Sequence, residues 1–163
     1  MKKILMISVL VLLVVAVLGV GFALLARSES ETQTVKLFYY NATKDLDDAG
    51  NVQCSEAGLD PVERILVSKE SPIEETLDLF LTGALTEEEQ NRGITTEFPL
   101  EGLELTQVDI DQGVVTLTFE DPKNKTSGGS CRVTVLWKQI EATVKQFPEV
   151  KEVKFSPEWL FQP

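Results

Sequence analysis

The chain has 163 residues, carries 26 acidic against 15 basic side chains and contains no histidine. Its formal net charge of −11 disfavours binding to nucleic acid phosphates and to anionic lipid headgroups. The lack of histidine removes the usual general base of serine and cysteine hydrolases and the commonest nitrogen ligand of zinc. Composition therefore argues against most familiar hydrolase sites and against a nucleic acid partner.

A hydrophobic run near the N-terminus is the most informative segment. Residues 4–26 contain no charged side chain and follow Lys2 and Lys3. As a helix they would span roughly 34 Å, enough for a hydrocarbon core of about 30 Å. Lysines before a first hydrophobic segment tend to stay in the cytoplasm, which predicts an extracytoplasmic C-terminal part. We expect residues 1–26 to be an uncleaved signal anchor in the cell membrane, with secretion after signal cleavage as the alternative.

The rest of the chain predicts a tethered domain. Residues 27–34 are polar and unpatterned, as in a flexible stalk. Residues 35–163 suffice for one ordinary domain with a single core. Cys54 and Cys131 are the only cysteines, and in an extracytoplasmic domain such a pair is most simply a disulfide. This bond would stabilise the domain by roughly 4 kcal/mol on the chain-entropy model. Two buried thiols are the alternative.

The first half of this domain predicts two strands and a helix. Residues 35–40 are rich in β-branched and aromatic side chains and predict a strand, and residues 62–67 predict another. Between them, residues 41–61 are crowded with Asp, Asn and Gly and predict a long loop. A helix is expected from Ser71, which is followed by proline and by a glutamate at capping-box spacing, and Gly83 is placed to end it.

The second half predicts a hairpin, a helix and a last strand. Thr86 begins another capping-box pattern, which indicates a short helical turn. Residues 103–110 and 114–119 alternate around a three-residue hairpin loop at 111–113, where Gly113 favours a positive φ. Apolar residues at helical spacing predict a helix over 133–147. The remaining predictions are a strand over 150–155 and a tail in which Trp159, Leu160 and Phe161 fold back onto the domain, with an exposed docking site as the alternative.

The order of these elements predicts an α+β fold. Strand, strand, helix, hairpin, helix and strand can bury their apolar faces as two layers. We expect one mostly antiparallel sheet with two helices on one face, following the N-terminal transmembrane helix.

Residues 139–153 carry the pattern Q-I-x-x-T-V-x-x-F-P-x-V-x-x-V, which resembles the closing segment of the GerMN domain of sporulation and germination proteins. The resemblance covers residues 35–155, and further segments agree with the family's pattern in the same order: 35–40, 61–67, 71–83, 96–99 and 113–119. It implies a bacterial, membrane-anchored, extracytoplasmic module similar to ring-building domains. The chain departs from the pattern in having a single copy, in lacking a lipidation cysteine, and in adding Cys54 and Cys131.

The resemblance brings no catalytic residues and no cofactor with it. We therefore expect a non-catalytic interaction or assembly module of the bacterial envelope, related to sporulation or germination. Its expected partners are the membrane, through the N-terminal helix, and an envelope protein or cell-wall component, or further copies of the chain. The alternative is binding or hydrolysis of wall glycan, which an aromatic cleft with two close carboxylates would favour.

Two local patterns suggest ligand sites. Residues 45–56 match a twelve-residue calcium loop at Asp45, Asp47 and Glu56, but Ala49 supplies no oxygen at the fifth position and strands are predicted where helices should flank the loop. An acidic, solvated loop is the preferred interpretation. Residues 126–130 are rich in Gly and Ser and precede a helix, so their backbone N–H groups could hold an anion. Capping of the helix by Ser127 or Ser130 is the preferred interpretation.

Overall fold

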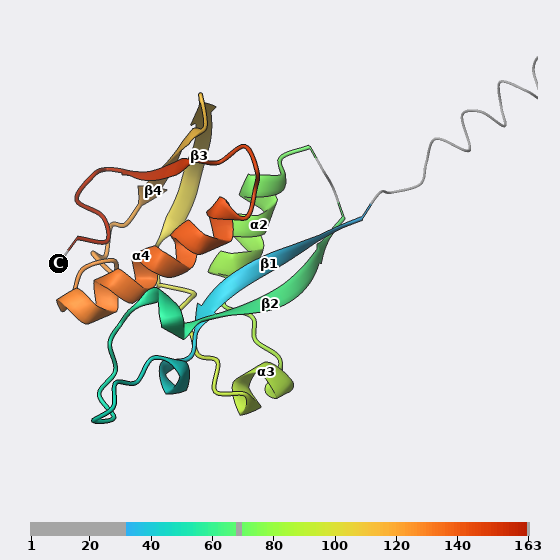
Figure 1. The fold of residues 1–163 in the computed structure, drawn as a ribbon. Coiled ribbons are helices and arrows are strands. Elements are labelled where there is room, and N and C mark those ends of the chain that lie inside the picture. Colours follow the sequence, from blue (N-terminus) through green and yellow to red (C-terminus); the bar gives the residue numbers. More distant parts are fainter. Residues whose placement is uncertain (1–31, 68–69, 163) are drawn as a thin grey trace, which may run out of the picture. The chain divides into compact units, whose positions relative to one another are not determined.

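The structure is a computed structural model that describes residues 32–67 and 70–162. From Thr32 onward the chain forms one compact unit of strands and helices (Figure 1). The hydrophobic run at 4–26 lies outside the described residues. In the part that the structure describes, no helix combines the length and hydrophobicity needed to cross a membrane.

The first two strands form a sheet of their own. β1 (Gln33–Tyr40) and β2 (Leu59–Leu66) pair antiparallel along their whole length and lie side by side in Figure 1. Side chains of β1 alternate between core and exterior, with Val35, Leu37 and Tyr39 buried. The long loop predicted between these strands is confirmed, and it holds only two short 3-10 turns, η2 (Ala42–Lys44) and η3 (Glu56–Gly58).

The remaining strands form a second sheet in the order β3-β4-β5. β3 (Glu104–Asp111) and β4 (Val114–Glu120) are antiparallel, and β5 (Glu152–Ser156) runs parallel to β4. The β3–β4 turn holds two residues, Gln112 and Gly113, with φ of 50° and 91°. Positive φ at both positions is typical of a type I′ turn, whose twist matches that of the strands. The three-residue loop expected here is therefore wrong by one residue.

The α+β class is confirmed, but the expectation of one mostly antiparallel sheet is wrong. The outer edge of β1 is occupied by α4 (Ser130–Lys145) and the residue after it. Thr143 Oγ1 accepts the N–H of Phe38 at 3.0 Å. Gln146 accepts the N–H of Lys36 at 2.8 Å and donates to its carbonyl at 2.7 Å. Because these side chains satisfy backbone groups that a neighbouring strand would need, the sheet ends at β1.

α2 (Pro72–Leu81) begins and ends where the sequence predicts. Ser71 makes no side-chain cap, so the capping box expected there is wrong, and proline at the first position starts the helix instead. Gly83 follows the helix with φ of 63°. A Cβ at this glycine would lie 1.8 Å from the carbonyl oxygen of Phe98, so any other residue would displace the neighbouring chain.

Both long helices contribute to one core. α2 and α4 contact each other, α4 also contacts β1 and β5, and α2 contacts β1, β2 and β3. The ring of Tyr39 stacks on Phe80 at 5.0 Å, and its hydroxyl donates to the Phe80 carbonyl at 2.8 Å. Burial raises the pKa of Tyr39 to about 12, which keeps this donor protonated. In the tail, Leu160 and Phe161 are buried as predicted, whereas Trp159 is 54% exposed.

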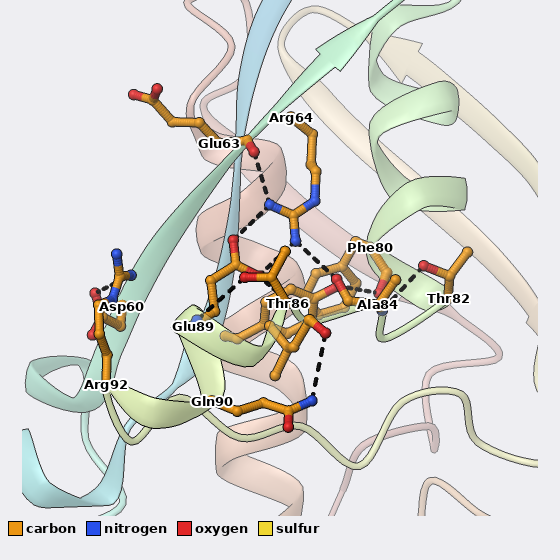
Figure 2. A network of polar contacts seen from close by, with 12 residues as sticks. Asp60, Glu63, Arg64, Phe80, Thr82, Ala84, Thr86, Glu89, Gln90 and Arg92 are labelled. Carbon is orange, nitrogen blue, oxygen red and sulfur yellow. Dashed lines mark hydrogen bonds and ion pairs between the residues drawn. The ribbon is translucent and has the colours of Figure 1, made fainter.

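The short helix α3 (Glu87–Asn91) is fastened to β2 by an ion pair, shown in Figure 2. Arg64 on β2 donates from both terminal nitrogens to the two oxygens of Glu89, at 2.7 and 2.8 Å. The same glutamate completes the predicted capping box by accepting the N–H of Thr86 at 2.8 Å. The bonds from Arg64 are the main reason that the pKa of Glu89 falls to about 2.

We predict that Glu89→Gln lowers the free energy of unfolding at pH 7 by about 2 kcal/mol. The substitution replaces the carboxylate by a neutral amide, so the guanidinium of Arg64 loses its charged partner. The folded-state pKa of Glu89 lies below its ordinary 4.5. Its contribution is therefore present above about pH 4.5 and is lost as the pH falls toward 2. Denaturant titrations at several pH values should show the difference from the unmodified protein shrink over that range.

Glu88 is the matched control, because it lies on the same helix and is exposed. Glu88→Gln should change the free energy of unfolding by less than about 0.5 kcal/mol. Equal losses from the two substitutions would show that general charge, and not the pair with Arg64, stabilises this region.

Candidate interaction site

The outer edges of β1 and β2 are closed to further pairing. α4 covers the outer edge of β1. On the outer edge of β2, Pro61 has no N–H, and Arg64 donates to the Glu63 carbonyl at 2.8 Å. β3 is interrupted by a bulge between Leu105 and Gln107. Bulges, prolines and covering side chains are the devices by which edge strands avoid unwanted pairing.

β5 presents an edge without a bulge, since all five of its residues pair in register with β4. It is the last strand of its sheet, and no other strand among the described residues lies on its outer side. The N–H of Glu152 bonds the Gly113 carbonyl on the β4 side at 3.2 Å. In an extended strand, alternate residues present their N–H and C=O groups to opposite sides. Val153 and Phe155 therefore direct their backbone groups away from β4.

A groove of about 720 Å³ runs along this edge. We call it the β5 groove. β5 contributes four of its eight lining residues, β4 and α4 contribute one each, and the tail after β5 contributes the other two. Its volume is in the range of sites that hold small ligands or short segments. The lining residues are Thr116, Trp137, Val153, Lys154, Phe155, Ser156, Glu158 and Gln162.

The helix-facing side of the β5 groove is aromatic and firmly packed. Trp137 meets Phe155 edge to face, with ring centroids 6.1 Å apart. Phe161 from the buried tail packs on Phe155 at 4.9 Å and on Phe119 at 5.9 Å. Such contacts stabilise beyond the burial of their area alone. The aromatic side of the groove is thus held in place before any ligand arrives.

One polar atom in this wall lacks a partner. Nε1 of Trp137 is buried, yet none of the described residues accepts a hydrogen bond from it. Buried N–H groups are nearly always paired, because leaving one unpaired costs about 1 to 3 kcal/mol. The other orphan among the described side chains, Oε1 of Gln139, belongs to a fully buried residue of α4. Of these two residues, Trp137 is the one that lines the β5 groove.

The opposite side of the β5 groove is polar. Lys154 pairs across the sheet with Thr116, and Ser156 is the next residue on the same face. The ammonium of Lys154 lies 3.6 Å from the Glu152 carboxylate, and both side chains are more than half exposed. An exposed pair of this kind contributes at most about 1 kcal/mol. Lys154 can therefore exchange this partner for another carboxylate at little cost.

The two cysteines are joined in the structure. Cys54 and Cys131 form a disulfide with a Cα–Cα distance of 5.3 Å across 77 residues of sequence. This bond attaches the long β1–β2 loop to the first turn of α4. Lys138 adds a second link from the same helix, to Glu56 at 2.7 Å. The helix that carries Trp137 is thus also the anchor of the loop.

The residues of the suggested calcium loop are not brought together. Asp45 is buried and accepts from the Tyr40 hydroxyl and from the Ser55 backbone N–H, the latter at 2.6 Å. Asp47 accepts two backbone N–H groups of its own turn, and Glu56 pairs with Lys138 on α4. Within residues 32–67 and 70–162, no group of three or more acidic or cysteine side chains could hold a metal ion. Each carboxylate instead has its own role in shaping the loop.

The Gly- and Ser-rich loop before α4 is organised by an arginine. Gly129 occupies the position before the helix and no side chain caps it, so the capping by serine predicted from the sequence is wrong. Ser127 donates to the Asn124 carbonyl at 2.9 Å. Arg132, in the first turn of the helix, reaches back to the carbonyls of Ser127 and Lys125 at 2.5 and 3.0 Å. This arginine satisfies loop carbonyls that would otherwise face solvent.

Sequence reasoning did not single out the residues of the β5 groove. Trp137 follows Leu136 of the buried helical stripe, so the sequence places it at the edge of the apolar face of the helix. Lys154 is an ordinary lysine within a short strand. A tryptophan beside an apolar stripe was the only local signal. The groove depends on the order of the strands, which no segment reveals alone.

Comparisons with known proteins agree with this fold. A family model described as Germane, sporulation and spore germination, matches residues 27–158. Among solved structures, the tandem GerMN domains of the sporulation protein GerM from Bacillus subtilis superpose with a TM-score of 0.51 at 18% sequence identity. The match covers 78% of this chain and 39% of that one, so the likeness is to well under half of the tandem protein and concerns the fold. No curated protein sequence matches significantly.

We predict that protein purified from the cell envelope reacts with a thiol reagent in denaturant only after a reductant has been added. Replacing both cysteines by alanine should lower the free energy of unfolding by about 4 kcal/mol, because the unfolded chain is no longer constrained. The reduced natural protein is the control and should match the double variant. Two thiols that react freely without reductant would show that the disulfide is not formed in the envelope.

Proposed function

The chain belongs to the Germane family of sporulation and spore germination domains, and from this premise we propose that it is a membrane-tethered, non-catalytic interaction module of the bacterial envelope. The hydrophobic run at 4–26 would hold it in the membrane, and the domain would act outside the cytoplasm by contact with an envelope component. The β5 groove carries the proposal, because it combines an available strand edge with a preformed aromatic wall and an orphan N–H donor.

The chemistry of the β5 groove favours contact over catalysis. Glycan hydrolysis requires a pair of carboxylates placed across the scissile bond. Of the residues that line the groove, Glu158 alone is acidic. A free strand edge beside side-chain pockets is, in contrast, a recurring arrangement in polypeptide recognition.

Binding of wall glycan without hydrolysis is the second candidate. Trp137 and Phe155 give the groove an aromatic surface, and sites for small ligands are commonly lined in this way. This alternative predicts that soluble glycan fragments bind in the β5 groove and do so independently of the free backbone edge.

The proposed topology can be tested on cells stripped of their wall. Because Lys2 and Lys3 precede the hydrophobic run, protease added outside should digest the domain while a cytosolic control protein survives. The protein should stay with the membrane until detergent is added. Protection equal to that of the cytosolic control would contradict the topology, and release without detergent would show signal cleavage.

The contact function can be tested by filling the β5 groove. Ser156→Arg adds bulk and charge to its lining and should reduce cross-linking to the envelope partner by about tenfold, together with the efficiency of sporulation or germination. The matched control is Gln107→Arg, which introduces the same side chain and charge at an exposed position of β3 outside the groove. It should leave both measurements unchanged.

A catalytic role would give a different pattern. If Glu158→Gln leaves cross-linking intact, yet abolishes the breakdown of wall polymer by the purified full-length protein, the contact proposal is wrong. Glycan hydrolysis then takes its place.

A further inference from the structure

We propose that the β5 groove binds an extended segment of a partner polypeptide, which adds to the three-stranded sheet as a fourth strand beside β5. The partner segment alternates apolar residues with polar ones and carries an acidic residue at the level of Lys154. This inference rests on the proposed contact function and names the class of partner.

Backbone pairing supplies the first part of the recognition. Val153 and Phe155 direct their N–H and C=O groups into the groove, and an added strand would bond them in the regular pattern of a sheet. β5 has five residues, which at about 3.3 Å each gives an edge of roughly 17 Å. A segment of about five to seven residues is therefore long enough to pair along the whole of β5.

The two sides of the groove set the side-chain pattern. Successive residues of a strand project to opposite faces of its sheet. On the helix-facing side an added strand meets Val153, Phe155 and Trp137, which favour apolar residues. On the other side it lies next to Lys154, for which a carboxylate is the complementary partner in a cross-strand pair.

The acidic net charge of the protein limits the preference for an acidic residue to one position of the bound segment, the one beside Lys154. At physiological salt, charges more than about 8 Å apart are largely screened, so the ammonium of Lys154 governs its immediate surroundings. Glu158 stands on the tail wall of the same groove. A run of acidic residues would meet this carboxylate, so we expect a single acidic residue flanked by neutral polar ones.

Trp137 supplies the third element. Trp137 lines the groove, and its buried Nε1 has no acceptor among the described residues; a small shift of the indole on binding would bring this N–H to a carbonyl or side-chain oxygen of the bound segment. A neutral hydrogen bond of this kind contributes about 0.5 to 1.5 kcal/mol. Its loss corresponds to a weakening of binding by roughly twofold to tenfold.

The test uses the full-length protein in detergent and a fluorescent synthetic peptide, Val-Thr-Val-Glu-Val-Thr-Val, with a solubilising polyethylene glycol tail. Two further peptides carry N-methyl groups, one on the odd and one on the even backbone amides. Only one of these sets can face β5 in an added strand. Fluorescence anisotropy should show binding of the parent peptide and of one methylated peptide, and loss of binding by the other.

Charge reversal tests the side-chain pattern. Lys154→Glu should weaken binding of the glutamate peptide about tenfold and strengthen binding of the same peptide with lysine at its centre. Trp137→Phe keeps an aromatic ring but removes the N–H, and it should weaken binding of the glutamate peptide and of the lysine peptide. Lys151→Glu changes an exposed lysine outside the groove lining and should have no effect.

The outcomes of these experiments distinguish strand addition at β5 from the general contact function. If none of the peptides binds at concentrations up to about 1 mM, or if both methylated peptides bind equally, strand addition is wrong. The contact function still stands in that case, provided that Ser156→Arg abolishes partner cross-linking in cells. If Ser156→Arg also has no effect, both proposals fail.

Discussion

The architecture depends on the way α4 closes the edge of β1. Thr143 and Gln146 satisfy backbone groups of Lys36 and Phe38 that would otherwise recruit a strand. Trp137 precedes Gln146 by nine residues, which at about 100° per residue places the two on opposite sides of the helix. The helix that ends one sheet therefore presents its indole to the last strand of the other. One side of α4 removes an edge, and the other forms the groove beside the edge that remains.

The same helix organises the longest loop of the domain. Its first turn holds Cys131, bonded to Cys54, and two turns later Lys138 reaches Glu56. Within that loop the buried carboxylate of Asp45 gathers the Tyr40 hydroxyl and the Ser55 backbone. A segment rich in Asp, Asn and Gly would ordinarily retain much conformational freedom, which these three attachments restrict. The loop thus adds to the stability of α4 at the end remote from Gln146.

A contact function is consistent with how the domain distributes its polar groups. Ion pairs and hydrogen bonds close the edges of β1 and β2 and hold α3 in place, as the low pKa of Glu89 reflects. The β5 groove differs because no strand among the described residues pairs with its backbone edge and the buried indole N–H of Trp137 has no acceptor among them, although the rings around them are firmly packed. A site that is rigid but incompletely paired loses little conformational entropy when a partner supplies the missing hydrogen bonds.

The sequence by itself determined the identity of the strands and long helices, the family, and the single cysteine pair, because periodicity, turn residues and motifs are local signals. It could not determine that β1 and β2 stand apart from β3, β4 and β5, since pairing depends on which groups α4 leaves free. For Asp45, Asp47 and Glu56 it favoured an acidic, solvated loop over a calcium site, whereas the fold gave each carboxylate a separate partner and buried Asp45. The β5 groove joins residues of β4, α4, β5 and the tail. Only tertiary structure could assemble it, because contacts between distant segments leave no pattern within any one of them.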